Sequence, residues 1–372
     1  MKLNSRWYKV AGIFLLLIFS LLTTNATNEA VEKPEKFEAG KVILEHIMDS
    51  HDWHLFSFKG HDVSIPLPII LFDRGKPVCF SSSNFHHGQQ SYKGYALGFT
   101  KESKNKVIKL SGEYAGYTGE ITEEMASAID LNDIPWDISI TKNVCALFFS
   151  LILIVVLFLY IAKQYKKQPL SAPHGVQSLF EVLIVYVRDE MVRPSLGDKS
   201  DKYLPYLLTL FFFIFLNNLL GLIPIFPAGA NITGNIAVTA ILALITFFIT
   251  QFSSNKTYWK HIVNTQGAPW WLKLPIPIMP IVELVGVITK PVVLMIRLFA
   301  NMTGGHIVML GFVCLIFIFG GIHPAIGYGV SLVSIFFYLF IALLELIVSF
   351  IQAFVFTLLT SLYIGMALEE GH

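Results

Sequence analysis

Ionisable residues interrupt an apolar stretch in the last third of the chain. Between positions 281 and 312, a sequence otherwise apolar enough for lipid contains Glu283, Lys290, Arg297, Asn301 and His306. On insertion scales, a charged side chain at the centre of a lipid-embedded helix costs roughly 2.5–3.5 kcal/mol. Such groups have to face protein or water, and each one is a candidate for moving or binding an ion.

Helical spacing places these groups relative to one another. Glu283, Lys290 and Arg297 are seven residues apart and share one stripe, and Asn301 follows one turn later. His306 lies about 13 Å further along the axis than Arg297 and on the opposite side of a regular helix. Arginine cannot release its proton, whereas glutamate and histidine can. The pattern predicts a permanent positive charge that separates two proton routes.

The last apolar segment repeats the pattern of polar residues within lipid-like sequence. Glu345, Ser349 and Gln352 share one face of a helix, and Tyr363 falls on nearly the same face. We expect the two polar stripes to pack together, with Arg297 facing Glu345 or Gln352. A carboxylate that carries protons past the arginine would have to belong to a partner protein.

Composition identifies an integral membrane protein. The 372 residues are 54% hydrophobic and 14% charged, with a mean hydropathy of +0.61, whereas soluble domains carry about 25% charged residues. A net charge of +1 argues against nucleic acid as a main partner. Two of the three cysteines, Cys145 and Cys314, fall in expected spans, so the sequence predicts no disulfide framework.

The N-terminal part is expected to be exported. Residues 1–26 have basic residues before an apolar run, which is typical of a secretory signal peptide; an uncleaved anchor is the alternative. Residues 27–137 are polar and predict a soluble segment with a helix over 41–58. Strand-like runs follow at 63–72, 78–80, 95–99 and 107–110. His51 and His54 are one turn apart, but we expect solvated surface histidines rather than a metal site.

Residues 138–372 are expected to form the membrane domain. Crossing helices are predicted at 143–162, 204–223 and 235–252, with an interfacial helix at 176–192. Segments 280–320 and 324–368 would each run about 60 Å, twice the ~30 Å hydrocarbon core. Each is either a hairpin, with Gly304-Gly305 as the turn of the first, or one strongly tilted helix, which we favour.

These elements predict an all-α integral membrane protein of about five membrane-embedded helices, preceded by a small β-rich or irregular exported segment. Lysines directly after the first span place that end, and with it the C-terminus, in the cytoplasm by the positive-inside rule. They are Lys163, Lys166 and Lys167.

Four motifs occur in order over residues 140–372. The combination resembles subunit a of the F-type ATP synthase. The matching motifs are Asn218-Leu-Leu-Gly-Leu-Ile-Pro224, Asn235–Thr239, Arg297-Leu-Phe-Ala-Asn301-Met preceded by Glu283 and Lys290-Pro291, and Gln352-Ala-Phe-Val-Phe preceded by Glu345 and followed by Tyr363.

The resemblance implies a role for each of these residues. Arg297 would face the carboxylate of a rotating ring of c subunits, and Glu283 would lie near a cytoplasmic half-channel. Asn301, Tyr363 and Lys290 would support the site. The exported-side half-channel would involve Asn218, Thr239, His306, Glu345 and Gln352.

The resemblance also implies the setting of the chain. It would be a subunit that is not an enzyme on its own, in the bacterial plasma (inner) membrane, with the c ring, the b subunits and the rest of the complex as partners. No cofactor or metal is implied. In two respects the chain departs from many bacterial members: the acid and imidazole at Glu345 and His306 are exchanged, and Gly221 replaces a frequent acid.

Other interpretations fit parts of the pattern. Arg297 could form a structural ion pair, and Asn218 or Thr239 could serve only helix packing. A stand-alone secondary transporter is the alternative function, but it usually has inverted repeats, and none is evident. An intramembrane metal enzyme using His306 and Glu345 would need a ligand motif such as HExxH, which the sequence lacks.

Overall fold

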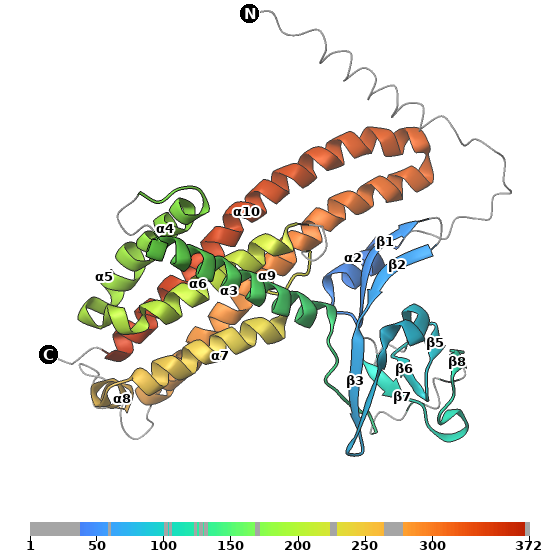
Figure 1. The fold of residues 1–372 in the computed structure, drawn as a ribbon, viewed down its shortest axis with the longest axis horizontal. Coiled ribbons are helices and arrows are strands. Elements are labelled where there is room, and N and C mark those ends of the chain that lie inside the picture. The colour runs from blue at the N-terminus through green and yellow to red at the C-terminus, as the bar shows by residue number, and fades with distance from the viewer. Residues whose placement is uncertain are drawn as a thin grey trace, which may run out of the picture.

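The computed structural model describes residues 38–58, 61–99, 103, 106–122, 125, 129, 133–167, 172–223, 229–263 and 278–368. The expected signal peptide at 1–26 and the acidic C-terminal tail at 369–372 lie outside these ranges. A small strand-containing N-terminal domain is followed by a bundle of long helices, and the two parts are in contact (Figure 1).

The bundle confirms the predicted helical membrane domain. Within the described residues, five segments are long and apolar enough to cross a membrane. The helices are α3 (Lys142–Lys167), α4 (Val176–Tyr186), α5 (Arg193–Leu196), α6 (Ser200–Gly221), α7 (Ile236–Ser253), α8 (Lys256–Val263), α9 (Ile278–Ile322) and α10 (Pro324–Leu368).

The two longest helices are unbroken, so the hairpin alternative is wrong. α9 and α10 have 45 residues each, or about 67 Å at 1.5 Å per residue. They lie side by side and antiparallel, joined at His323 (Figure 1). Gly304-Gly305 does not form a turn, because a turn at that depth would leave backbone N–H and C=O groups unsatisfied in lipid.

The expected interfacial helix at 176–192 is interrupted. α4 ends at Tyr186, and a π-helical turn, Val187–Val192, leads into α5. Asp189 accepts hydrogen bonds from Arg188 at 2.9 Å and from Arg193 at 2.8 Å across this turn. At this turn Val187 and Met191 enter the core of the bundle.

Large apolar side chains from several helices fill that core. Leu207 and Phe211 of α6 pack with Leu298 of α9 and with Ala353 and Phe356 of α10. The outward sides of the same helices expose aliphatic and aromatic residues, as a lipid-facing surface requires.

The N-terminal domain confirms the expected β-rich segment. Its strands pair antiparallel in the orders β1-β2, β4-β3-β9, β5-β8 and β6-β7. Ile69, Leu71 and Phe85 form the centre of its core. The elements are α2 (Ala39–Ile47), β1 (Asp52–Phe58), β2 (His61–Pro66), β3 (Pro68–Asp73), β4 (Lys76–Ser81), η1 (Ser82–Gly88), β5 (Gln90–Ser91), β6 (Tyr95–Leu97), β7 (Val107–Lys109), η2 (Gly112–Tyr114), β8 (Gly119–Glu120) and β9 (Trp136–Asp137).

Two boundaries in this domain differ from expectation. The helix predicted over 41–58 ends at Ile47, and β1 occupies its second half. Asp49 side-chain oxygens bind backbone and hydroxyl groups of distant residues, which holds the chain out of helical geometry there. The strand predicted over 63–72 divides at Leu67 because Pro66 and Pro68 on either side lack the N–H that a ladder needs.

His51 and Asp137 join the start of β1 to β9. His51 Nε2 lies 2.7 Å from Asp137 Oδ2, and the Ser139 N–H donates to Oδ1 at 2.9 Å. Burial would raise the pKa of Asp137, but the hydrogen bonds from His51 and Ser139 outweigh it and hold that pKa below 3.8. A depressed carboxyl pKa stabilises the fold above the unfolded pKa, and this stability is lost as pH falls through the folded value.

We therefore expect Asp137→Asn to lose less thermal stability than the unchanged chain when pH falls from about 5 to about 3. The measurement is thermal unfolding of the purified full chain in detergent, followed by tryptophan fluorescence. Asp198→Asn, at an exposed position, is the matched control and should keep the original pH slope. If Asp137→Asn keeps the pH slope of the unchanged chain, the His51–Asp137 pair does not contribute to the loss of thermal stability at low pH.

Candidate functional site

Two groups of buried polar side chains lie toward opposite ends of the bundle. The domain end is the end at which α3 begins, at Lys142, next to the N-terminal domain; the far end carries α8 and the last turn of α3 (Figure 1). Arg297 lies between the two groups along α9, about 10 Å beyond Lys290 and about 13 Å before His306.

Asn218 is the centre of the polar group at the domain end. It is fully buried on α6, and its Nδ2 donates to the Ser349 carbonyl of α10 at 3.4 Å. Its Oδ1 accepts a hydrogen bond from the Thr233 hydroxyl at 2.6 Å. Because the amide satisfies both partners, α6 and α10 are linked to the chain segment before α7 through one polar side chain.

That segment, residues 229–235, supplies groups that the sequence did not single out. Asn231 Nδ2 lies 3.5 Å from the Met302 carbonyl of α9, and the Thr303 hydroxyl donates to the Gly234 carbonyl at 3.3 Å. The alternation of polar and apolar residues from Ala230 to Thr233 was the signal available in the sequence. Thr239 is also buried, but its hydroxyl donates to carbonyls of its own first turn.

His306 projects from α9 toward the end of α6. Nδ1 lies 2.9 Å from the Met302 carbonyl, and Nε2 lies 3.3 Å from the Gly221 carbonyl. Both neighbours are acceptors, whereas a neutral imidazole has one N–H, so only the protonated ring can donate to both. A Cβ at Gly221 would lie 3.8 Å from the ring, so any longer side chain at position 221 would meet the imidazole.

The Glu345 side chain is buried against the backbone of α9. A Cβ at Gly305 would overlap its carboxylate, so the acid can lie in this position only beside a glycine and would have to shift if residue 305 were larger. Among the described residues, Glu345 Oε1 and Ser349 Oγ have no hydrogen-bond partner. A buried unsatisfied polar atom costs about 1–3 kcal/mol, and such atoms occur where water or function requires them. Gln352 continues this buried row two turns after Glu345.

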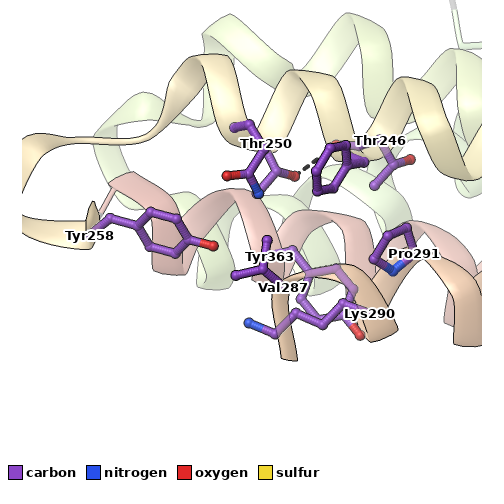
Figure 2. A pocket seen from close by; sticks show the side chains of 9 residues that line it. Thr246, Thr250, Tyr258, Val287, Lys290, Pro291 and Tyr363 are labelled. Carbon is purple, nitrogen blue, oxygen red and sulfur yellow. Dashed lines mark hydrogen bonds between the residues drawn. The ribbon is translucent and has the colours of Figure 1, made fainter. Parts of the chain in front are cut away.

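A cavity marks the second polar group, at the far end. It has a volume of ≈ 20 Å³, about enough for one water molecule. Figure 2 shows that Thr246 and Thr250 of α7, Lys290 of α9 and Tyr363 of α10 surround it. The Tyr206 hydroxyl lies 3.0 Å from Thr246 Oγ1, and the Thr250 hydroxyl donates to the Thr246 carbonyl at 2.8 Å.

Lys290 and Glu283 differ in their relation to this cavity. The Lys290 ammonium lies 5.3 Å from the centre of the Tyr363 ring, a cation–π contact across the α9–α10 interface. Glu283 is half-buried one turn before Val287 and is absent from the cavity lining. The structure thus brings Lys290 and Tyr363 together and leaves Glu283 at the start of α9.

Arg297 has no neutralising partner in the part of the chain that the structure describes: neither Glu345 nor Gln352 forms a hydrogen bond or an ion pair with it. It is half-buried at the edge of an exposed face of α9 that includes Val293, Ile296 and Asn301. A cation at membrane depth requires a counter-charge. The open side of the helix leaves room for one on another protein.

The arrangement can keep two proton routes apart. Groups able to accept or donate protons lie on both sides of a residue that stays charged at every accessible pH. A proton entering at His306 and Glu345 cannot pass along α9 to the far-end cavity without crossing the Arg297 charge. A mobile carboxylate from outside the chain would complete the transfer.

Comparisons with known proteins match both parts of the chain. The family model of the ATP synthase A chain covers residues 144–365, and a model described as a domain of unknown function (DUF8433) covers residues 42–138.

Among similar proteins is ATP synthase subunit a of Pelodictyon phaeoclathratiforme, which is 44% identical over 63% of this chain and 68% of its own length. ATP synthase subunit a 2 of Chlorobaculum tepidum is 45% identical over 64% and 67%. ATP synthase subunit a of Myxococcus xanthus is 41% identical over 68% and 80%.

Proposed function

The chain belongs to the ATP synthase A chain family, and on that premise we propose how its buried polar groups move protons. It is a non-catalytic, proton-conducting stator subunit of the Fo sector of an ATP synthase. A stand-alone transporter is not favoured, because the relatives described above are named as subunits of this complex.

The domain-end group is the exported-side half-channel, and the far-end cavity belongs to the cytoplasmic one. Lys163, Lys166 and Lys167 at the far end support this orientation through the positive-inside rule. We place the chain in a bacterial inner membrane. In this orientation its C-terminus is cytoplasmic. The chain divides into a signal peptide at 1–26, an exported domain at 27–137 and a membrane domain at 138–372.

Protons from the exported side reach the c ring through His306 and Glu345. Asn218 and Gln352 orient this route, and Thr239 lines α7 beside it. On the other side, protons leave past Lys290 and Tyr363 toward Glu283, which lies near the cytoplasmic mouth. Titratable groups within a membrane are the usual carriers in such paths.

Arg297 faces the c ring from the edge of α9. The observation that carries the proposal is that this arginine, between two polar groups, has no counter-charge in the described part of its own chain. A ring carboxylate that arrives at Arg297 is attracted in its ionised form and gives up its proton. Asn301, one turn later and exposed, supports the same face. The b subunits hold the chain in the stator, as in its family.

Two adjacent glycines allow a matched test of the exported-side route. Gly305→Ala should displace the Glu345 carboxylate, whereas a Cβ at Gly304 meets nothing within 4 Å. We expect Gly305→Ala to reduce passive proton conductance about tenfold or more, because a displacement of about 1 Å can cost that much. Gly304→Ala should conduct normally. The conductance is measured in membrane vesicles after removal of the peripheral catalytic sector.

Equal conductance in the two variants, at equal amounts of assembled complex, would show that protons do not pass Glu345. Equal losses in both variants would instead indicate a general effect on α9. Only a loss confined to Gly305→Ala supports the proposed route.

A further inference from the structure

The end of the N-terminal domain that meets the bundle is tied to the first turn of α3. The Asp49 carboxylate accepts hydrogen bonds from the Asn143 N–H at 3.0 Å and from the Thr141 hydroxyl at 2.7 Å. The Lys142 N–H donates to the Ser50 carbonyl at 2.9 Å. A carboxylate at a helix N-terminus satisfies free N–H groups and favours the helix dipole. The domain therefore caps a membrane helix.

Trp53, four residues after Asp49, extends this contact to the polar segment of the bundle. It is 5% exposed and packs against Ala146 of α3 and against Ala230 and Ile232 of the 229–235 segment. Partly buried residues of β2, α3 and α7 pack against the same cluster: Ile65, Cys145, Leu147 and Val238. Trp53 thus shares one buried cluster with α3 and with the segment between α6 and α7.

The 229–235 segment alternates between two environments. Ala230 and Ile232 lie in the cluster around Trp53, whereas Asn231 and Thr233 bind Met302 and Asn218. Tight turns hold the segment together, because the Ile232 N–H donates to the Ala230 carbonyl at 3.0 Å and the Asn235 N–H to the Ile232 carbonyl at 3.1 Å. A shift of Ala230 and Ile232 therefore moves the two polar side chains that meet α6 and α9.

We infer that Trp53 is a positioning residue for the exported-side half-channel, so that the N-terminal domain acts on proton entry from outside the membrane. The inference rests on the proposed function of Asn218 and His306. It gives the domain of unknown function a role in the same reaction: it sets the position of the segment whose Thr233 binds Asn218 and whose Asn231 meets α9.

The test uses the complete ATP synthase with the full chain, in vesicles freed of the peripheral catalytic sector. We expect Trp53→Ala to lower passive proton conductance about tenfold, and Trp53→Phe to restore most of it by refilling the contact. Trp136→Ala removes a tryptophan of the same domain that is 78% exposed, and it should conduct normally. The loss in Trp53→Ala should also change the dependence on exported-side pH and leave the dependence on cytoplasmic pH as it was.

Normal conductance of Trp53→Ala at a normal amount of complex would overturn the inference, as would an equal loss in Trp136→Ala. If Trp53→Ala does not accumulate, Trp53→Val removes most of the ring volume but keeps an apolar side chain, and its normal conductance would overturn the inference equally. His306→Ala, measured alongside, separates the two proposals. If His306→Ala is impaired and Trp53→Ala is not, only the positioning role fails; if His306→Ala conducts normally, the proposed inlet is itself wrong.

Discussion

Replacing Arg297 by alanine should abolish coupled ATP synthesis, by about 10²-fold or more, while the complex still assembles. In the described residues the guanidinium has no partner of its own that would be left buried and unneutralised. Its loss therefore removes little from the fold. What disappears is the charge that draws a ring carboxylate into its ionised form and keeps the two half-channels apart.

The measurement is ATP synthesis driven by an imposed proton gradient in membrane vesicles, normalised to the amount of assembled complex. Arg193→Ala is the control, since Arg193 is an exposed cation on α5 that pairs with Asp189 at 2.8 Å. Surface pairs of this kind contribute about 0–1 kcal/mol. Full coupling in Arg297→Ala would refute the rotary mechanism proposed for this site.

The second large effect is expected for Glu345→Gln. Glutamine keeps the size of the side chain and its fit against Gly305, but it cannot take up and release a proton. Loss of a positioned proton-transfer group typically costs about 10²-fold or more. We expect passive proton conductance to fall by that factor with the complex intact.

Glu190→Gln is the matched control for Glu345→Gln, since Glu190 is exposed at the π-helical turn after α4. Passive proton conductance is measured in membrane vesicles after removal of the peripheral catalytic sector, as for Gly305→Ala and Gly304→Ala. Normal conductance of Glu345→Gln would show that the carboxyl serves packing alone. An equal loss of conductance in Glu190→Gln would show that removing a carboxylate lowers conductance even far from the proposed route.

The sequence was sufficient to predict the positions of the membrane helices, because few backbone structures other than a helix can span lipid. A span needs about 20 apolar residues, so α3, α6 and α7 begin and end within a few residues of expectation. The polar stripes of α9 and α10 followed from helical spacing. The sequence also placed Asn218, His306 and Glu345 in buried positions without any knowledge of their neighbours.

Hydropathy and helical spacing could not predict contacts between segments that are distant in the sequence. Asp49 and Asn143 are 94 positions apart, and no periodicity connects them. In the sequence Gly305 could only be considered as a turn residue of the hairpin alternative, because its need for close approach appears once Glu345 of another helix lies beside it. Helical spacing placed Lys290 on one stripe with Glu283, but it could not show that Lys290 meets the Tyr363 ring across the α9–α10 interface.

The capping of α3 by Asp49 has a consequence for how the protein can be divided. The family model begins at residue 144, yet a chain cut there would start with uncapped N–H groups and would expose Ala146, Ala230 and Ile232 to water. Uncovering such groups costs several kcal/mol, comparable to the whole stability of a domain. We therefore expect the stable folding unit of this protein to include the N-terminal domain as well as residues 144–365 that the family model matches.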